Sequence, residues 1–182
     1  GTRTLARQAA EQGVRRFVFL SSVKVNGEET PPGVRFTADD PPSPQDAYAQ
    51  SKYEAELALF EIGLRFGMEI VVIRPPLVYG PGVTGNFASM LRWVQAGVPL
   101  PFGAVKNNRS LVALDNLVDL VITCLKHPRA GGRVFLVSDD EDVSTADLLR
   151  RVSRLTGRSA RLAPVPPRML ECAAIALGKR EM

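Results

Sequence analysis

Three short apolar runs, at residues 16–20, 68–73 and 133–137, most constrain what this chain can fold into. The middle run is rich in β-branched residues and does not alternate between apolar and polar positions, which suits a strand covered on both faces. Stretches with the composition of helices separate the runs. Because parallel strands need a crossover between them, this order predicts a doubly wound α/β fold with a parallel sheet.

Capping and stop signals place the other elements. A first helix is expected over residues 2–12, ended by Gly13, and a long one over residues 47–66. Between them, residues 27–46 are rich in Gly, Pro and Asp and predict a loop. Further elements are expected as helices at 86–96, 115–125, 144–155 and from Pro166 to about Gly178, and as short strands at 110–114 and 162–165.

Composition excludes several classes of protein. The hydrophobic fraction of 45% and the charged fraction of 23% are ordinary for a globular chain. The net charge of +4 comes from Lys and Arg residues that are scattered singly or in pairs, so no nucleic-acid partner is expected. The apolar stretch at 169–177 is too short to span a bilayer. Cys124 and Cys172 have no partners at metal-ligand spacing, so we expect free thiols in a reducing cytoplasm and no metal site.

Tyr48 and Lys52 stand four residues apart in the long predicted helix, so they lie one turn apart on the same face. The ordinary pKa of a tyrosine, about 10, is too high for base chemistry at neutral pH, and a nearby ammonium favours the phenolate. Ser21 and Ser22 close the first predicted strand and can supply a hydroxyl that bridges the phenol to a substrate oxygen. These residues predict a proton-transfer site for carbonyl and alcohol chemistry.

Four motifs follow one another in a fixed order. They are the strand from Phe17 to Ser22, Gly27, the motif from Tyr48 to Lys52, and the loop Arg74-Pro-Pro-Leu-Val-Tyr-Gly-Pro-Gly82. Together they resemble the extended short-chain dehydrogenase/reductase superfamily and, more narrowly, its NAD-dependent epimerase/dehydratase branch, which acts on nucleotide sugars. The resemblance covers nearly the whole chain, but no G-x-x-G-x-x-G phosphate loop is present. It therefore implies the C-terminal portion of a Rossmann-like enzyme, with NAD or NADP as cofactor and a nucleotide sugar as substrate.

The resemblance implies a role for each matching residue. The catalytic trio is Ser22, Tyr48 and Lys52, and Tyr48 exchanges a proton with a sugar hydroxyl while hydride moves at the same carbon. The residues expected to contact the cofactor are Ser21, Tyr48, Lys52, Pro75, Pro76, Leu77 and Val78. Those expected to contact the substrate are Ser22, Lys24, Asn86 and Arg109. The guanidinium of Arg109 suits the diphosphate because its fork of donors fits phosphate oxygens.

The resemblance also implies two regions. Residues 1–75, with residues 112–140 returning to them, are expected to form the C-terminal half of a dinucleotide-binding Rossmann domain. Residues 76–111 and 141–182 are expected to form a small α/β substrate-binding region. A homodimer is a candidate assembly, because the helix that bears the tyrosine often packs against a second copy in this superfamily. Without a phosphate loop, we expect these residues alone to bind the cofactor poorly and to be inactive.

Departures from the family pattern leave the substrate open. Epimerases of this family usually have Asn where Leu77 stands and Tyr where Asn26 stands, and dehydratases carry an Asp-Glu pair where Val23 and Lys24 stand. The sequence therefore allows an enzyme like UDP-glucose 4-epimerase or like a 4-reductase of UDP-4-keto-6-deoxy sugars. The remaining alternatives are a ketone reductase of the 3β-hydroxysteroid or dihydroflavonol type, a non-catalytic nucleotide-binding module, and an incomplete fragment.

Overall fold

The computed structural model describes residues 1–82, 86–157, 161–166 and 169. The chain divides into two compact units. One comprises residues 1–78 with 112–139, and the other comprises residues 79–111 with 140–182. The chain thus leaves the first unit after Val78 and returns to it at Val112. The functional roles expected of the two regions stay predictions.

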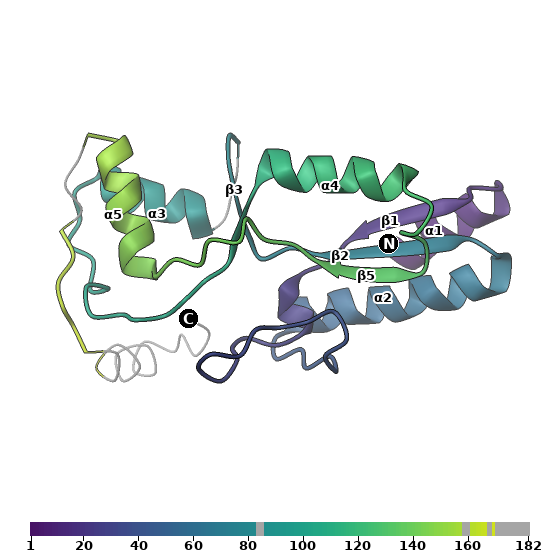
Figure 1. Ribbon diagram of the computed structural model, residues 1–182, viewed down its shortest axis with the longest axis horizontal. Helices are drawn as coiled ribbons and strands as arrows, with labels where there is room; N and C mark the ends of the chain where they lie inside the picture. Colours follow the sequence, from purple (N-terminus) through teal and green to yellow (C-terminus); the bar gives the residue numbers. More distant parts are fainter. Residues whose placement is uncertain (83–85, 158–160, 167–168, 170–182) are drawn as a thin grey trace. The chain divides into compact units, whose positions relative to one another are not determined.

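A parallel sheet forms the centre of the first unit (Figure 1). Its strands, in spatial order, are β1 (Arg16–Leu20), β2 (Glu69–Arg74) and β5 (Arg133–Leu136). In the register of the sheet, Val18 lies beside Val71, and Val72 lies beside Val134. The parallel sheet predicted from the three apolar runs is therefore confirmed.

Helices cover both faces of this sheet (Figure 1). They are α1 (Thr2–Glu11) and α2 (Ala47–Phe66) on one face and α4 (Leu114–Lys126) on the other. Ile70 and Val72 of β2 join the cluster with α1 and α2, whereas Val71 and Ile73 join the cluster with α4. The middle run is unbroken in apolar character because both of its faces are buried. None of the helices in the described part of the chain is long and apolar enough to cross a membrane.

Two residues fix the length of α2. At its start, Asp46 accepts a hydrogen bond of 2.6 Å from the Ala49 N–H, which satisfies one free donor of the first turn. At its end, Gly67 adopts a φ of 68°, in the left-handed region that favours glycine. Tyr48 therefore lies in the first turn of α2, and Lys52 lies in the second.

The second unit contains two helices that pack side by side, α3 (Asn86–Gln95) and α5 (Thr145–Leu155) (Figure 1). Its buried core consists of Val94, Leu100, Leu149 and Val152. Ser144 caps α5, because its hydroxyl oxygen accepts a hydrogen bond of 3.0 Å from the Asp147 N–H. The sequence predicts a strand at 162–165, but only Leu162 pairs, in a single bridge with Leu100. Pro164 has no N–H and cannot extend this pairing.

Short elements connect the larger ones. They are the 3-10 helix η1 (Val23–Val25) and the paired strands β3 (Leu77–Tyr79) and β4 (Leu111–Ala113). The sequence predicts a loop where β3 forms, because its three residues stand among the prolines and glycines of segment 75–85. The helix expected after Pro166 falls largely outside the described residues.

Replacing Gly63 with Ala is expected to destabilise the protein, although Ala favours a helix over Gly by about 1 kcal/mol. A Cβ atom at this position would lie 2.7 Å from Met68 O and from Ile70 Cγ1, and the backbone carbonyl cannot move aside freely. We expect a net loss of about 1–3 kcal/mol in the free energy of unfolding, measured by urea denaturation. Leu64→Ala is the control, because Leu64 is 89% exposed on the same helix and its loss should cost less than about 0.5 kcal/mol. A stabilised Gly63→Ala variant would contradict this packing.

Candidate functional site

Lys52 joins the helix that carries Tyr48 to the end of β1. Its Nζ atom donates a hydrogen bond of 3.0 Å to Leu20 O, the last carbonyl of that strand. The same Nζ lies 5.0 Å from the centroid of the Phe19 ring and 5.7 Å from the centroid of the Tyr48 ring. The two residues thus lie one turn apart, as their spacing predicts, at the carboxyl end of a parallel strand. Ligands of open α/β sheets bind at this end.

The hydroxyls of Ser22 and Tyr48 are both available to a substrate. Ser22 follows β1 and caps η1, where its Oγ accepts a hydrogen bond of 3.3 Å from the Lys24 N–H. Its hydroxyl proton is not donated to any described residue. Tyr48 is 53% exposed, and its hydroxyl makes no hydrogen bond within the described part of the chain. Each group therefore retains its capacity to bond a reacting oxygen.

Ser21 is held differently from its neighbour Ser22. It is 4% exposed, and its Oγ donates a hydrogen bond of 2.5 Å to Oε1 of Glu56. Its backbone N–H donates to Ile73 O at 2.7 Å, which extends the pairing of β1 with β2. The proton of the Ser21 hydroxyl is thus committed inside the protein. The cofactor contact expected of Ser21 stays a prediction.

Glu56 and Arg74 form a buried, two-point ion pair. Arg74 Nε donates to Glu56 Oε1 at 3.0 Å, and Arg74 Nη2 donates to Glu56 Oε2 at 2.6 Å. Their side chains are only 3% and 4% exposed. Such an arrangement uses the planar fork of the guanidinium on both carboxylate oxygens. Sequence reasoning missed this pair, although Glu56 follows Lys52 by four residues and so shares its face of α2.

Asn26 completes the bonding of Arg74. Its Oδ1 accepts a hydrogen bond of 3.0 Å from Arg74 Nη1, and its Nδ2 donates one of 2.8 Å to Thr37 O. The residue is 3% exposed. In the sequence, Asn26 is a departure from the tyrosine usual in epimerases. In the structure it is a buried link between the end of β2 and the loop that comes after η1.

Lys24 lies between two carboxylates. Its Nζ is 2.6 Å from Asp46 Oδ2 and 2.8 Å from Glu28 Oε1. These hydrogen bonds, the one with Asp46 foremost, raise the pKa of Lys24 above its usual value near 10.5. In turn, the Ala49 N–H and the Lys24 ammonium lower the pKa of Asp46 from its usual value near 3.8. Lys24 therefore ties η1 to the cap of α2, and its expected substrate contact stays a prediction.

The loop expected at the nicotinamide follows β2 directly. It comprises four half-buried residues, Pro75, Pro76, Leu77 and Val78. The carbonyl of Pro75 accepts a hydrogen bond of 3.0 Å from the Val23 N–H. This bond holds the start of the loop against the residue after Ser22, so the loop and the serine share one edge of the sheet.

The two remaining substrate candidates belong to the second unit, and the structure describes each unit by itself. The backbone of Arg109 pairs with Val143 through hydrogen bonds of 2.9 and 3.0 Å. Its exposed guanidinium makes no hydrogen bond to a described residue. The neighbouring Ser110 Oγ donates to Oδ1 of Asp142 at 2.7 Å. Asn86 is the first residue of α3, and its side chain lies outside what the structure describes.

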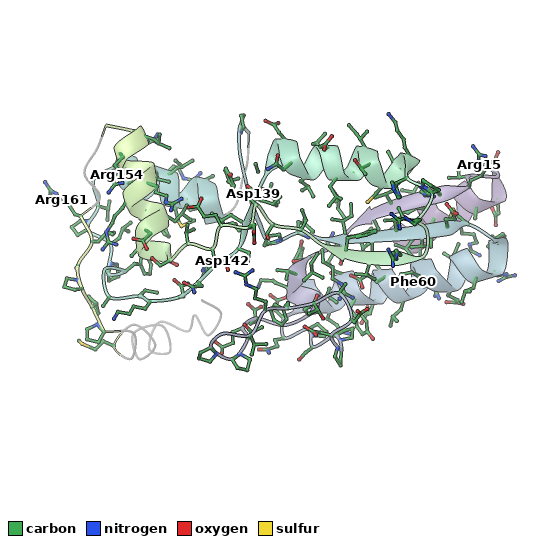
Figure 2. All side chains as sticks on the ribbon, viewed as in Figure 1. Arg15, Phe60, Asp139, Asp142, Arg154 and Arg161 are labelled. Carbon is green, nitrogen blue, oxygen red and sulfur yellow. The ribbon has the colours of Figure 1, made fainter. Side chains whose placement is uncertain are left out.

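Asp139, at the end of the first unit, anchors the return from β4 into α4 (Figure 2). Its Oδ2 accepts a hydrogen bond of 2.9 Å from the Ala113 N–H, and its Oδ1 accepts one of 2.8 Å from Asn116 Nδ2. The bond to Ala113 satisfies a backbone donor just before the helix. Sequence reasoning did not identify this role, because Asp139 stands within an acidic run at 139–142 that carries no capping signal.

Comparison with known sequences shows which protein family this chain resembles. A family model described as the NAD dependent epimerase/dehydratase family matches residues 1–138. The UDP-glucose 4-epimerase of Vibrio cholerae is 51% identical over 167 residues, which cover 91% of this chain and 51% of that protein. The chain spans about half the length of the curated relatives that it matches.

Solved structures share the fold. The UDP-glucuronic acid 4-epimerase of Bacillus cereus, in complex with UDP-glucuronic acid and NAD, matches with a TM-score of 0.77 and 22% identity, over 91% of this chain and 54% of that one. The UDP-glucose 4-epimerase of Thermus thermophilus, in complex with NAD, matches with a TM-score of 0.76 and 23% identity, over 98% of this chain and 63% of that one. At these identities the likeness concerns the fold, and the predicted α/β class is confirmed.

Removing either partner of the Glu56 and Arg74 pair is expected to cost about 3–5 kcal/mol in the free energy of unfolding, because the other charge stays buried. The double variant Glu56→Gln/Arg74→Gln should cost clearly less than the sum of the single changes. Urea denaturation of all four proteins in a double-mutant cycle measures this coupling. The exposed pair Asp147 and Arg150 is the matched control, with coupling below about 1 kcal/mol. Additive losses at the buried pair would refute the prediction.

Acidification is expected to remove the stabilising contribution of Asp46. Because its folded-state pKa is lowered, the contribution is complete above its unfolded pKa near 3.8 and is lost as pH falls through the folded value. Asp46→Asn keeps a cap for α2 but removes the titrating charge. Thermal unfolding from about pH 5 to about pH 2 should thus show a smaller fall of Tm in Asp46→Asn than in the unaltered protein. Identical pH profiles would show that Asp46 makes no such contribution.

Proposed function

Because the chain belongs to the NAD-dependent epimerase/dehydratase family, we propose that the whole protein is a nucleotide-sugar 4-epimerase that uses NAD. One observation carries the proposal. Lys52 is bonded to the end of β1, where neither the Ser22 nor the Tyr48 hydroxyl donates its proton to a described residue. The 51% identity to the UDP-glucose 4-epimerase of Vibrio cholerae supports a UDP-sugar as the substrate class.

Tyr48 acts as the proton acceptor in this proposal. Its phenolate oxygen takes the proton from the sugar hydroxyl as the C–H bond at the same carbon breaks, and it returns a proton when that bond reforms on the other face of the sugar. Ser22 donates its hydroxyl proton in a hydrogen bond to the reacting oxygen and holds that oxygen in line with Tyr48. The ammonium of Lys52, 5.7 Å from the Tyr48 ring centroid, stabilises the negative charge on the phenolate.

The described residues fit the nicotinamide end of NAD. Lys52 has three N–H donors and gives one to Leu20 O, so donors remain for the ribose hydroxyls. The loop at 75–78 follows the carboxyl end of β2, beside that of β1, where dinucleotides bind to such sheets. When bound, NAD supplies the acceptor and the donor of the hydride. The chain's own residues supply position and charge.

The substrate diphosphate is assigned to Arg109. Its guanidinium is exposed and is not engaged by a described residue, so it can offer its fork of donors to phosphate oxygens. Asn86 and Lys24 are the further substrate contacts that we propose. For Lys24, the substrate would share an ammonium already bonded to Asp46 and Glu28.

A 4-reductase of UDP-4-keto-6-deoxy sugars is the second candidate, and Leu77 is the residue that favours it. Leu77 is half-buried in β3 and places an apolar side chain where epimerases of the family usually carry an amide. The two reactions differ in stoichiometry. An epimerase returns its hydride to the sugar and has no net redox change, whereas a reductase consumes one reduced cofactor for each product.

We further propose a homodimer in the cytoplasm. Exposed leucines on α1 and α2 support association, with Leu5 59% and Leu57 53% exposed. Cys124 is a buried free thiol, and burial raises its pKa, which suits a protein of a reducing compartment. Cys172 lies outside the described residues.

Tyr48→Phe in the whole protein is expected to lower kcat for UDP-sugar epimerisation by at least about 100-fold, because the proton acceptor is removed. Binding of NAD should change little, since the ring remains and Lys52 keeps its bond to Leu20 O. Tyr53→Phe is the control, because it removes a phenol from the same helix at a position outside the site. Turnover by Tyr48→Phe at the unaltered rate would refute the catalytic assignment.

A further inference from the structure

We propose that Ser21, Glu56 and Arg74 form a positioning network that sets the distance between the Ser22 and Tyr48 hydroxyls. The inference rests on the proposed function of that site. The three side chains make no hydrogen bond to either hydroxyl. They act through the backbone of β1, the loop after β2 and the helix α2, which carry the reacting groups.

The first link is the face of α2. Tyr48, Lys52 and Glu56 follow one another at intervals of four residues and so form a row along one side of the helix. The row runs from the exposed phenol to a carboxylate that is 2% exposed. A rotation or slide of α2 that displaces Tyr48 must also displace Glu56. Holding Glu56 therefore holds the stretch of helix backbone that carries the phenol.

The second link is the backbone on both sides of Ser22. On one side, Ser21 is bonded to Glu56 through its hydroxyl and to Ile73 O through its N–H. On the other side, the Val23 N–H donates to Pro75 O, the carbonyl of the residue next to Arg74. Ser22 thus lies between two anchored residues. One anchor is α2 itself, and the other is the end of β2.

The third link is the directional character of the bonds. Glu56 Oε1 accepts hydrogen bonds from both Ser21 Oγ and Arg74 Nε. This one oxygen atom therefore joins α2 to the residue after β1 and to the last residue of β2. An apolar contact at this point would tolerate a small slide of the helix, because it has no preferred direction. Buried, fully paired charges tolerate only one arrangement, since any displacement leaves a charge without its partner.

Ser21→Ala in the whole protein is the principal test. It removes the bond to Glu56 but leaves the ion pair in place, so the fold is retained. We expect kcat for epimerisation to fall by about 10- to 100-fold, while KM for the UDP-sugar changes by less than about 3-fold. With substrate deuterated at the carbon that loses hydride, the isotope effect on kcat should rise, because misalignment slows the chemical step. Ser153→Ala, which removes a buried hydroxyl bond within the second unit, should leave kcat and the isotope effect unchanged.

The double variant Glu56→Gln/Arg74→Gln provides a second test without an unpaired buried charge. It should show the same fall in kcat and the same rise in isotope effect. If kcat falls only in proportion to the fraction of active sites, with the isotope effect unchanged, the network is structural and the inference is wrong. Unaltered kcat and isotope effect in Ser21→Ala would also overturn it.

A measurement without turnover separates this inference from the proposed function. Amide hydrogen exchange of the unliganded protein should become faster at residues 22–26 and 47–52 in Ser21→Ala, and not in Ser153→Ala. If Tyr48→Phe retains full turnover while this exchange still changes, the proposed function fails and the coupling between Ser22 and α2 stands. If Tyr48→Phe is inactive but exchange and kcat in Ser21→Ala match the unaltered protein, only the network fails.

Discussion

The parallel pairing of β1 with β2 is the constraint on which the candidate site depends. Leu20 lies beside Ile73 in the register, so both strands end at the same edge of the sheet. The residues that follow the two strands therefore lie side by side. Ser21 and Ser22 leave one strand there, and Pro75 leaves the other. A shift of one residue would turn the buried side chains of β2 toward the opposite helices, so the apolar core itself fixes this juxtaposition.

The polar groups at this edge divide into two sets. Ser21, Glu56 and Arg74 are buried, and each is bonded to a neighbour within the protein. Ser22 and Tyr48 are more exposed, and neither hydroxyl donates its proton to a described residue. Lys52 stands between the sets, because it donates one hydrogen bond to Leu20 O and no other hydrogen bond to the residues that the structure describes. The candidate site therefore consists of available groups carried on elements whose own buried polar groups are hydrogen-bonded within the protein, an arrangement that suits a preorganised site.

Periodicity and spacing in the sequence predicted the strands and the placement of the tyrosine and lysine. The three apolar runs became three parallel strands because their burial on both faces requires an unbroken apolar pattern, and the spacing of Tyr48 and Lys52 placed them one turn apart on α2. Periodicity and spacing could not predict the ion pair of Glu56 and Arg74. A charged residue is expected to be exposed unless its partner is known, and here 18 residues separate the two partners. For the same reason the ion pairs of Lys24 could not be foreseen. Strand β3 was missed because proline and glycine around it signal a turn.

Asn26 shows how the structure changes the meaning of a sequence departure. Its difference from the usual tyrosine argued against an epimerase, on the assumption that the side chain faces the substrate. Instead, Asn26 is 3% exposed, and both ends of its amide are bonded, to Arg74 and to Thr37 O. The amide of Asn26 accepts a hydrogen bond from the buried Arg74 guanidinium. Its presence therefore does not indicate which sugar the protein binds. Of Asn26 and Leu77, only Leu77 still bears on the choice between an epimerase and a reductase, and it lies half-buried in β3, the strand that leads out of the first unit.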